Sequence, residues 1–179
     1  MGTAEQPGLL FKSARAYVRI VDKISEIVGK GAMFLVLVMM AILLMETISR
    51  LFFNSAQIWA VEFSQFVMAA YYILGGAYVL IIGGHVRMDL VYHRWSPKNK
   101  ALSDVITFAV AILYIIILWY GGWKGLLYAI KYKQVSYSSW APSLIPIKVI
   151  LQIGLTLMVF QMIAEFIKNL GTLFGREIV

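Results

Sequence analysis

The feature that most constrains the fold is a long, mostly apolar segment from Ile58 to Asp89. No Asp, Glu, Lys or Arg occurs from Phe66 to Ile82. With its flanks, this run reaches about the 20 residues that an α-helix needs to cross roughly 30 Å of hydrocarbon. The segment therefore predicts a membrane-spanning helix, and the rest of the chain has to fit around it.

Composition extends this prediction to the whole chain. Of the 179 residues, 61% are hydrophobic and only 14% are charged, which is too little polar surface to coat a soluble globule. We therefore expect an all-α integral membrane protein. The net charge of +7 comes from Lys and Arg between the apolar runs, which favours membrane lipids over nucleic acid as the counterpart. Because Cys is absent, disulfides and thiolate chemistry are excluded.

Four apolar runs predict four membrane spans. They cover about residues 31–50, 60–82, 104–123 and 145–167, within a membrane domain at 31–168 that is followed by a tail at 169–179. Pro146 suits the first turn of the last span, where its missing N–H does no damage. Lys and Arg are more numerous on the side that holds both termini, so we expect both termini in the cytoplasm.

Residues 1–30 predict an amphipathic helix ahead of the first span. Its basic and aromatic positions suit a helix that lies in the plane of the cytoplasmic headgroup layer. A helix packed on protein fits the pattern equally well. The apolar face holds Leu10, Ala14, Tyr17, Val21, Ile24 and Val28, and the charged residues Lys12, Arg15, Arg19, Asp22, Lys23, Glu26 and Lys30 lie on the other faces.

A row of small residues follows the second span. Glu62, Ala69, Gly76 and Gly83 recur at every seventh position and so lie nearly above one another. Small residues let a second helix approach closely, which is how helices associate in lipid. Gly and Ala are also common in membrane helices without such a role. We interpret the row as a seam for a partner helix.

The histidines do not predict a catalytic, cofactor or metal site. His85, Asp89 and His93 are spaced four apart, as metal ligands on one helical face are, but Arg87 and Arg94 beside them oppose a cation. Two axial haem ligands normally come from facing helices, so a haem-binding bundle fits poorly. We favour a polar cap where the second span leaves the membrane.

Four acidic residues near the span ends need partners. A carboxylate at the bilayer centre costs about 3 kcal/mol and less near the ends, so position argues weakly for a proton relay. The candidates for pairing are Arg50, Lys148, a partner subunit and interfacial water, and a partner contact is favoured for Glu62. The acids are Glu46 and Glu62 at the outer ends and Asp104 and Glu165 at the inner ends.

Several short motifs occur in a characteristic order and together resemble one family. The chain from Gly31 to Lys168 is similar to the small membrane subunit of tripartite ATP-independent periplasmic (TRAP) transporters, the DctQ-like family. No single motif is specific, and their order and placement carry the resemblance. The motifs are Trp59-x-x-Glu62, Gly75-Gly76-Ala77, His85-Val86-Arg87-Met88-Asp89 and Ser139-Trp140-Ala141-Pro142, with Pro146 before the last span.

The resemblance implies a division of labour between three proteins in a bacterial or archaeal inner membrane. A periplasmic binding protein captures an organic anion and delivers it to a large, sodium-driven elevator subunit, which holds the substrate and the sodium ions. The small subunit, similar to this chain, is then a fixed, non-enzymatic scaffold without a cofactor of its own. It braces the large subunit and helps to receive the binding protein.

Family features and the row of small residues together give two sets of candidate residues. The resemblance implies contacts with the large subunit at Trp59 and Glu62 and, as a cluster at the inner end, at His85, Arg87 and Asp89. The row of small residues adds Ala69, Gly76 and Gly83 to this expected interface. Arg87 and Asp89 could instead pair locally. The expected docking residues for the binding protein are Lys131, Lys133, Tyr137 and Trp140.

Two other classes of membrane protein are alternatives, and the first of them also has four spans. A stand-alone small multidrug-type proton antiporter works as a homodimer with a glutamate in the middle of its first span, whereas Glu46 lies near the end of its span. An anchor subunit of a membrane oxidoreductase would show a haem absorption band. Both remain alternatives to the TRAP subunit at the level of sequence.

Overall fold

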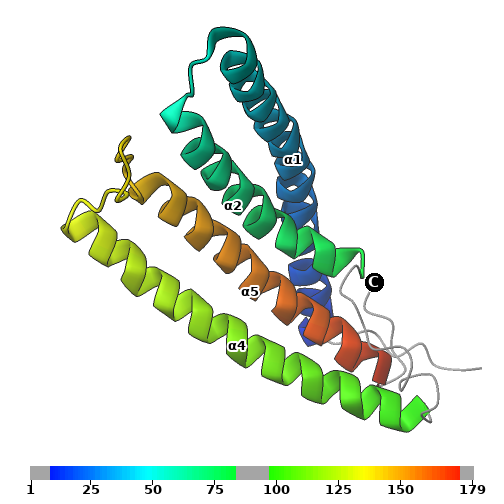
Figure 1. Cartoon of the computed structure of the whole chain (residues 1–179). Helices are drawn as coiled ribbons and strands as arrows, with labels where there is room; N and C mark the ends of the chain where they lie inside the picture. The colour runs from blue at the N-terminus through cyan, green and yellow to red at the C-terminus, as the bar shows by residue number, and fades with distance from the viewer. Residues whose placement is uncertain (1–8, 84–96, 174–179) are drawn as a thin grey trace, which may run out of the picture.

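The computed structural model describes residues 9–83 and 97–173, with side chains at 13–83 and 107–168. These residues form four long helices, α1 (Leu9–Phe53), α2 (Ile58–Ile81), α4 (Pro97–Lys131) and α5 (Ile145–Leu173) (Figure 1). Each helix is long and apolar enough to cross a membrane. The predicted all-α architecture with four membrane-spanning helices is confirmed.

Helix α1 differs from the sequence prediction because it is continuous. We expected one helix at 1–30 and a separate span at 31–50, but α1 runs for 45 residues without a break. Gly29 and Gly31 do not end it, because no proline or capping residue follows them and Gly29 packs closely against α2. At 1.5 Å per residue the helix is about 68 Å long, roughly twice the hydrocarbon thickness. The in-plane position of its first part stays a prediction.

Helix α4 also extends beyond its predicted span. We expected about 104–123, whereas the helix begins at Pro97 and continues to Lys131. Gly121, Gly122 and Gly125 lie inside it and do not terminate it. Gly122 lies against Gln152 and Leu155 of α5, so tertiary packing offsets the low helix propensity of glycine there. The last turns of α4 therefore carry Lys124 and Lys131 on a rigid helix rather than on a loop.

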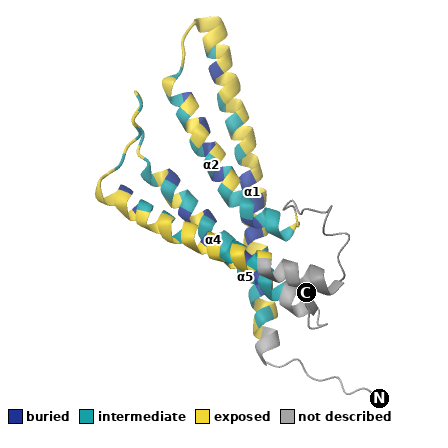
Figure 2. Ribbon diagram, turned by 60° about the horizontal axis from the view of Figure 1, so that its bottom comes forward, coloured by how far each residue is buried: buried dark blue, intermediate teal, exposed yellow. Residues whose placement is uncertain are grey.

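The helices form an open arrangement instead of a closed bundle. Helix α2 packs between α1 and α5, α5 packs between α2 and α4, and α1 also contacts α5. Among the described helices, α4 packs extensively against α5 alone. Figure 2 shows two helix pairs, α1–α2 and α4–α5, that diverge toward the end carrying the connections 54–57 and 132–144. We call this the outer end and the opposite end the inner end, following the predicted orientation.

The open arrangement leaves most apolar surface uncovered. Only 11% of the residues in the most apolar window of α1 and of α4 are buried, against 33% for α5. In Figure 2, exposed residues run along α1 and α4, and buried residues gather where α2 and α5 meet their neighbours. Helix α5 is thus the central element, and the outer faces of α1 and α4 are available to lipid or to other proteins.

Glycines set the closest approaches between helices. A Cβ atom on Gly29 would lie 2.3 Å from the Tyr78 Cβ, so α1 and α2 meet there with no room for a larger residue. A Cβ on Gly154 would lie 2.9 Å from two side-chain carbons of Ile73, which joins α5 to α2. Close packing at small residues is the usual basis of helix association in membranes.

The inner end of α1 is fixed to α5 by a small core and polar contacts. Val18 and Val21 pack with Ala164, and the Tyr17 hydroxyl donates a hydrogen bond to the Phe160 carbonyl at 3.2 Å. Asp22 accepts hydrogen bonds from Gln161 at 2.7 Å and from Lys168, whose Nζ lies 2.9 Å from the second carboxylate oxygen. The same Lys168 ammonium lies 2.7 Å from Glu165, so Glu165 is paired within the chain.

Candidate partner-subunit interface

Trp59 and Glu62 occupy the outer end of α2. The Trp59 ring is half-buried and meets Phe63 edge to face, with centroids 6.3 Å apart. Glu62 is half-buried too, and its Oε2 atom is buried without a hydrogen-bond partner among the described residues. A buried carboxylate oxygen that lacks a donor is energetically unfavourable. Within the described residues, the Glu62 Oε2 atom therefore lacks the hydrogen-bond donor that a buried carboxylate requires.

The face on which Glu62 lies follows from its neighbours on α2. Ile73 and Gly76 come 11 and 14 residues later, which at 100° per residue places all three on one side of the helix. Ile73 and Gly76 contact Gly154 and Met158 of α5. Glu62 therefore lies on the α5 side of α2, about three turns closer to the outer end.

The predicted seam of small residues is divided between different surroundings. A Cβ on Gly76 would lie 3.0 Å from the Met158 sulfur, so the neighbour that Gly76 admits is α5 of the same chain. Ala69 is half-buried on the same helix. Gly83 is exposed and has a φ of +63°, which serves the turn that ends α2. The row alone does not define a surface reserved for a partner.

The inner-end cluster predicted from sequence lies outside the described residues. His85, Arg87 and Asp89 all fall in this part of the chain, as does the alternative metal site with His93. Within residues 9–83 and 97–173, no group of three or more His, Cys, Asp or Glu is placed to hold a metal ion. The role of the cluster stays a prediction.

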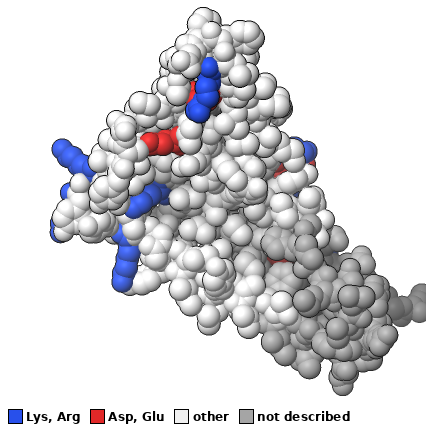
Figure 3. Space-filling view, in the orientation of Figure 1, with Lys and Arg blue, Asp and Glu red and all other residues white. Residues whose placement is uncertain are grey.

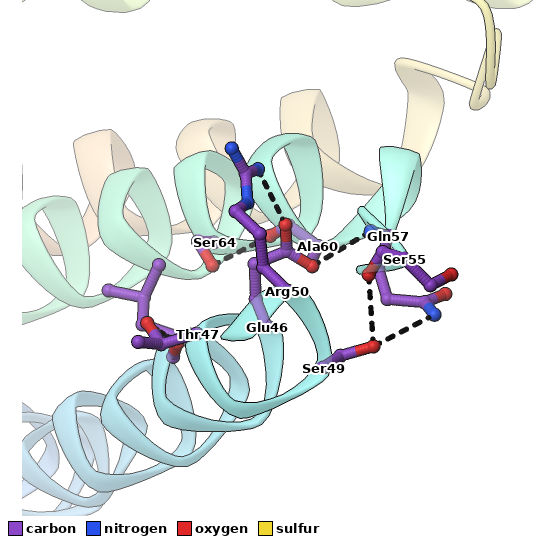
Figure 4. Close-up of polar contacts among 9 residues, drawn as sticks. Glu46, Thr47, Ser49, Arg50, Ser55, Gln57, Ala60 and Ser64 are labelled. Carbon is purple, nitrogen blue, oxygen red and sulfur yellow. Dashed lines mark hydrogen bonds and ion pairs between the residues drawn. The ribbon is translucent and has the colours of Figure 1, made fainter. Parts of the chain in front are cut away.

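Glu46 holds the outer ends of α1 and α2 together (Figure 4). The residue is only 6% exposed, and its Oε1 accepts a hydrogen bond from Arg50 at 2.7 Å. Its Oε2 accepts one at 2.9 Å from the backbone N–H of Gln57, the N-cap residue of α2, whose side chain makes no capping hydrogen bond. Sequence had left the partner of Glu46 open. The structure assigns it to Arg50 and the start of α2, where a negative charge also complements the helix dipole.

The turn beside Glu46 is held by further hydrogen bonds. Ser49 donates to the Ser55 carbonyl at 3.0 Å and accepts from the Gln57 side chain at 3.4 Å (Figure 4). Asn54 has a φ of 46°, a conformation that asparagine tolerates better than most residues. Polar side chains in this turn are thus largely used within the chain.

An apolar pocket of about 680 Å³ lies next to this turn. Trp59 and Gln57 line one side of it, and α1 supplies the rest. Its size and open shape suit a bulky side chain of another protein or a lipid chain. The α1 residues that line it are Ala41, Leu44, Met45, Ile48, Ser49 and Phe53.

The connection 132–144, which we call the outer loop, has an ordered shape. The Ser136 N–H donates to the Pro142 carbonyl at 2.9 Å and the Leu144 N–H donates to the Gln134 carbonyl at 3.0 Å. Val135 and Ser143 form an isolated antiparallel bridge. The loop therefore folds back on itself and presents its tip away from the helices.

The predicted docking residues are all exposed on or beside this loop. Tyr137 is fully exposed at 101%, and Trp140 is 42% exposed. Lys131 lies 5.5 Å from the centre of the Tyr132 ring, and Lys133 has a φ of 46°. Figure 3 shows Lys and Arg gathered around the end of the molecule where α4 meets α5, next to a wide uncharged face. The structure thus places these four residues on one protruding feature.

Lys148 anchors the outer loop from the first turn of α5. Its ammonium donates to the Gln134 side-chain oxygen at 2.7 Å and to the Gly125 carbonyl at 3.3 Å. Lys148 was considered as a partner for a membrane acid, but it binds two neutral oxygens instead. Its charge lies near the C-terminal end of α4, which favours a cation.

Sequence reasoning missed a polar contact between α4 and α5. The Trp119 indole N–H donates to the Thr156 hydroxyl at 2.9 Å, and Gln152, which is 4% exposed, donates to the Trp119 carbonyl at 3.4 Å. The signal was present: Gln152 and Thr156 lie four apart, on one face of an otherwise apolar span. Polar side chains at such positions often bond between membrane helices.

Within the described residues, the chain has four helices suited to cross a membrane, uncovered apolar sides, an acid with one unsatisfied oxygen and a basic, aromatic outer loop. Residues 39–172 match the family described as tripartite ATP-independent periplasmic transporters, DctQ component, and the chain belongs to this family. It is thus a multi-pass membrane component of such a transporter. Among curated proteins, none matches the chain.

Proposed function

We propose that this chain is the stationary small subunit of its transporter. In this role it braces a large, sodium-driven membrane subunit and helps to receive a periplasmic binding protein during uptake of organic acids. The observation that carries the proposal is the open arrangement of helices, in which the outer faces of α1 and α4 remain apolar and uncovered. Large contiguous apolar faces are typical of surfaces that meet lipid or other membrane proteins.

The polar groups inside the helix layer support a structural role. Glu46, Lys148, Gln152 and Lys168 each bind atoms of a neighbouring helix or connection within the chain. A stand-alone carrier needs polar groups that converge on a solute near the midplane, commonly at interrupted helices. The described helices are uninterrupted, and these four polar side chains tie the chain together. We assign the transport path to the large subunit.

The antiporter alternative requires a membrane glutamate that is free to exchange protons. Glu46 accepts hydrogen bonds from Arg50 and from the start of α2, so both of its oxygens are already engaged. Family membership together with this geometry favours the transporter subunit over the antiporter.

We assign Glu62 to the contact with the large subunit. Its buried Oε2 has no donor among the described residues, and it lies near the outer end of α2, on the side that packs against α5 further along. A Lys or Arg side chain, or a hydroxyl donor, from a helix of the large subunit would satisfy it. Trp59, three residues earlier, would lie against the same helix beside the apolar pocket.

The test for Glu62 is co-purification. We expect Glu62→Ala to reduce recovery of the large subunit in mild detergent at least severalfold, because the donor on the partner loses its acceptor. Glu26→Ala is the matched control, since Glu26 is an exposed acid paired with Lys30. Unchanged recovery with Glu62→Ala would remove this residue from the interface.

The test for the outer loop uses charge reversal. Lys131→Glu with Lys133→Glu is expected to slow uptake when the binding protein is limiting and to leave the maximal rate nearly unchanged, because complementary charge mainly raises the association rate. Lys131→Arg with Lys133→Arg should behave like the parent. Equal uptake by the reversed variant at limiting binding protein would exclude the loop from docking.

A further inference from the structure

The inner half of α1 has a second apolar stripe that sequence periodicity did not separate from the first. Val18, Val21 and Ser25 are buried against the rest of the chain. Ile20, Ile24 and Ile27 lie about a third of a turn away and are 59%, 44% and 63% exposed. Ile24 was predicted to share the buried face, and the structure places it on the exposed stripe. An exposed isoleucine stripe on a soluble surface is unfavourable, so a partner environment has to cover it.

Two basic residues border this exposed stripe. Arg19 and Lys23 are both exposed and lie on adjacent turns of α1, on the side next to Ile20 and Ile27. Among the described residues, no acidic side chain pairs with either of them. The next charges along the helix, Glu26 and Lys30, pair with each other. Within the described part of the chain, Arg19 and Lys23 thus present two positive charges without an acidic partner beside an apolar stripe.

The position of Arg19 and Lys23 relative to the membrane can be inferred from the contact between α1 and α5. Helix α5 carries no Asp, Glu, Lys or Arg from Val149 to Ala164, and Lys168 lies just beyond that run. Lys168 binds Asp22, which is located between Arg19 and Lys23 on α1. The two basic residues therefore lie at the level where α5 leaves the hydrocarbon, which is where lipid phosphates are found.

We propose that this surface binds an anionic phospholipid of the leaflet at the inner end. Arg19 and Lys23 hold the phosphate, and an acyl chain lies along Ile24 and Ile27. The chemistry on both sides is complementary: a guanidinium and an ammonium face a phosphate, and an aliphatic stripe faces an aliphatic chain. A helix of the large subunit would cover the stripe equally well, but it would leave the two cations without an anion. The proposal does not depend on the role of Glu62 or of the outer loop.

The experiment measures lipid binding to the purified full-length chain in neutral detergent, by native mass spectrometry with added phosphatidylglycerol or phosphatidylcholine. Each basic side chain near an anionic surface contributes about fivefold in affinity, so Arg19→Gln with Lys23→Gln should weaken phosphatidylglycerol binding roughly 25-fold. Binding of phosphatidylcholine should change little. The control is Lys131→Gln with Lys133→Gln, which removes the same charge at the outer end and should keep the affinity of the parent.

Two results would overturn the proposal. If the Arg19→Gln, Lys23→Gln variant binds phosphatidylglycerol as tightly as the parent, no phosphate is held there; loss of the large subunit in the same variant would then assign the surface to protein. If the outer-end control loses as much affinity as the inner-end variant, binding follows total charge and not a site on α1.

Discussion

At the outer end, the two helices of each pair are held together by a charged side chain, and the two charges have opposite signs. The α1–α2 pair is joined by a short turn and held by an anion, Glu46, which accepts from the backbone at the start of α2. The α4–α5 pair is joined by the longer outer loop and held by a cation, Lys148, which donates to a carbonyl near the end of α4. In each pair the sign of the charge matches the helix end that it meets.

The difference between the two connections shows where a surface for partners can arise. In the short turn, Ser49, Glu46 and Gln57 bond to one another, and few polar groups remain for another protein. In the outer loop, only the base is fixed by Lys148, and Tyr137 and Trp140 extend outward. A charge near the outer end thus holds each pair together, but the longer α4–α5 connection is the one that extends Tyr137 and Trp140 outward.

The largest effect is expected where the two pairs are joined. Gly154→Leu forces a side chain into space that Ile73 occupies, including a backbone carbon 3.1 Å from the Cβ position. We expect α2 and α5 to separate and the chain to lose about 3 kcal/mol of stability, measured by thermal unfolding in detergent. Gly121→Leu is the matched control, because a Cβ there meets nothing within 4 Å. Equal melting of the two variants would contradict the packing described.

The second-largest effect is expected for the Glu46 carboxylate, which holds α1 and α2 together at the outer end. Glu46→Ala removes the acceptor for the Gln57 N–H and leaves Arg50 without its partner. We expect the apparent Tm to fall by several degrees, whereas Glu26→Ala, which breaks an exposed pair, should leave it nearly unchanged. Equal Tm values for the two variants would show that the burial of Glu46 does not increase its contribution to stability.

The smallest effect is expected for the Lys148 ammonium, which holds the outer loop and the end of α4 to α5. Lys148→Met removes the donor to Gln134 at a cost of about 1–2 kcal/mol, so the outer loop should open more often while the helices stay packed. Limited proteolysis should then cleave the loop roughly tenfold faster. Lys124→Met, a change at an exposed lysine of α4, serves as the control. A loop that resists cleavage in the Lys148 variant would show that its own hydrogen bonds suffice.

Sequence predicted the architecture because membrane helices are encoded by composition. Four apolar runs of sufficient length leave no other fold that satisfies the backbone in lipid. Helix ends were harder to predict: the first span was expected to begin at Gly31 and the third to end at about Trp123, but α1 and α4 continue through these points and pack against α2 and α5 there. Local patterns do not contain this tertiary contribution.

Side-chain partners were predictable only where they are local. The pair Glu46–Arg50 has helical i, i+4 spacing and was among the alternatives, whereas the bond from Gln57 to Glu46 depends on how α2 approaches α1. The seven-residue row that includes Gly76 was visible, but not the identity of its neighbour, Met158. A small residue indicates that another helix can pack closely there, but it does not identify that helix.

The account is tested most directly by transport in vesicles that contain this chain alone, the large subunit alone, or both, with the binding protein and a sodium gradient supplied. We predict uptake of an organic acid when both membrane subunits are present and no movement of solute or ions through this chain alone. Solute or proton flux catalysed by the chain by itself would contradict the role of a stationary brace.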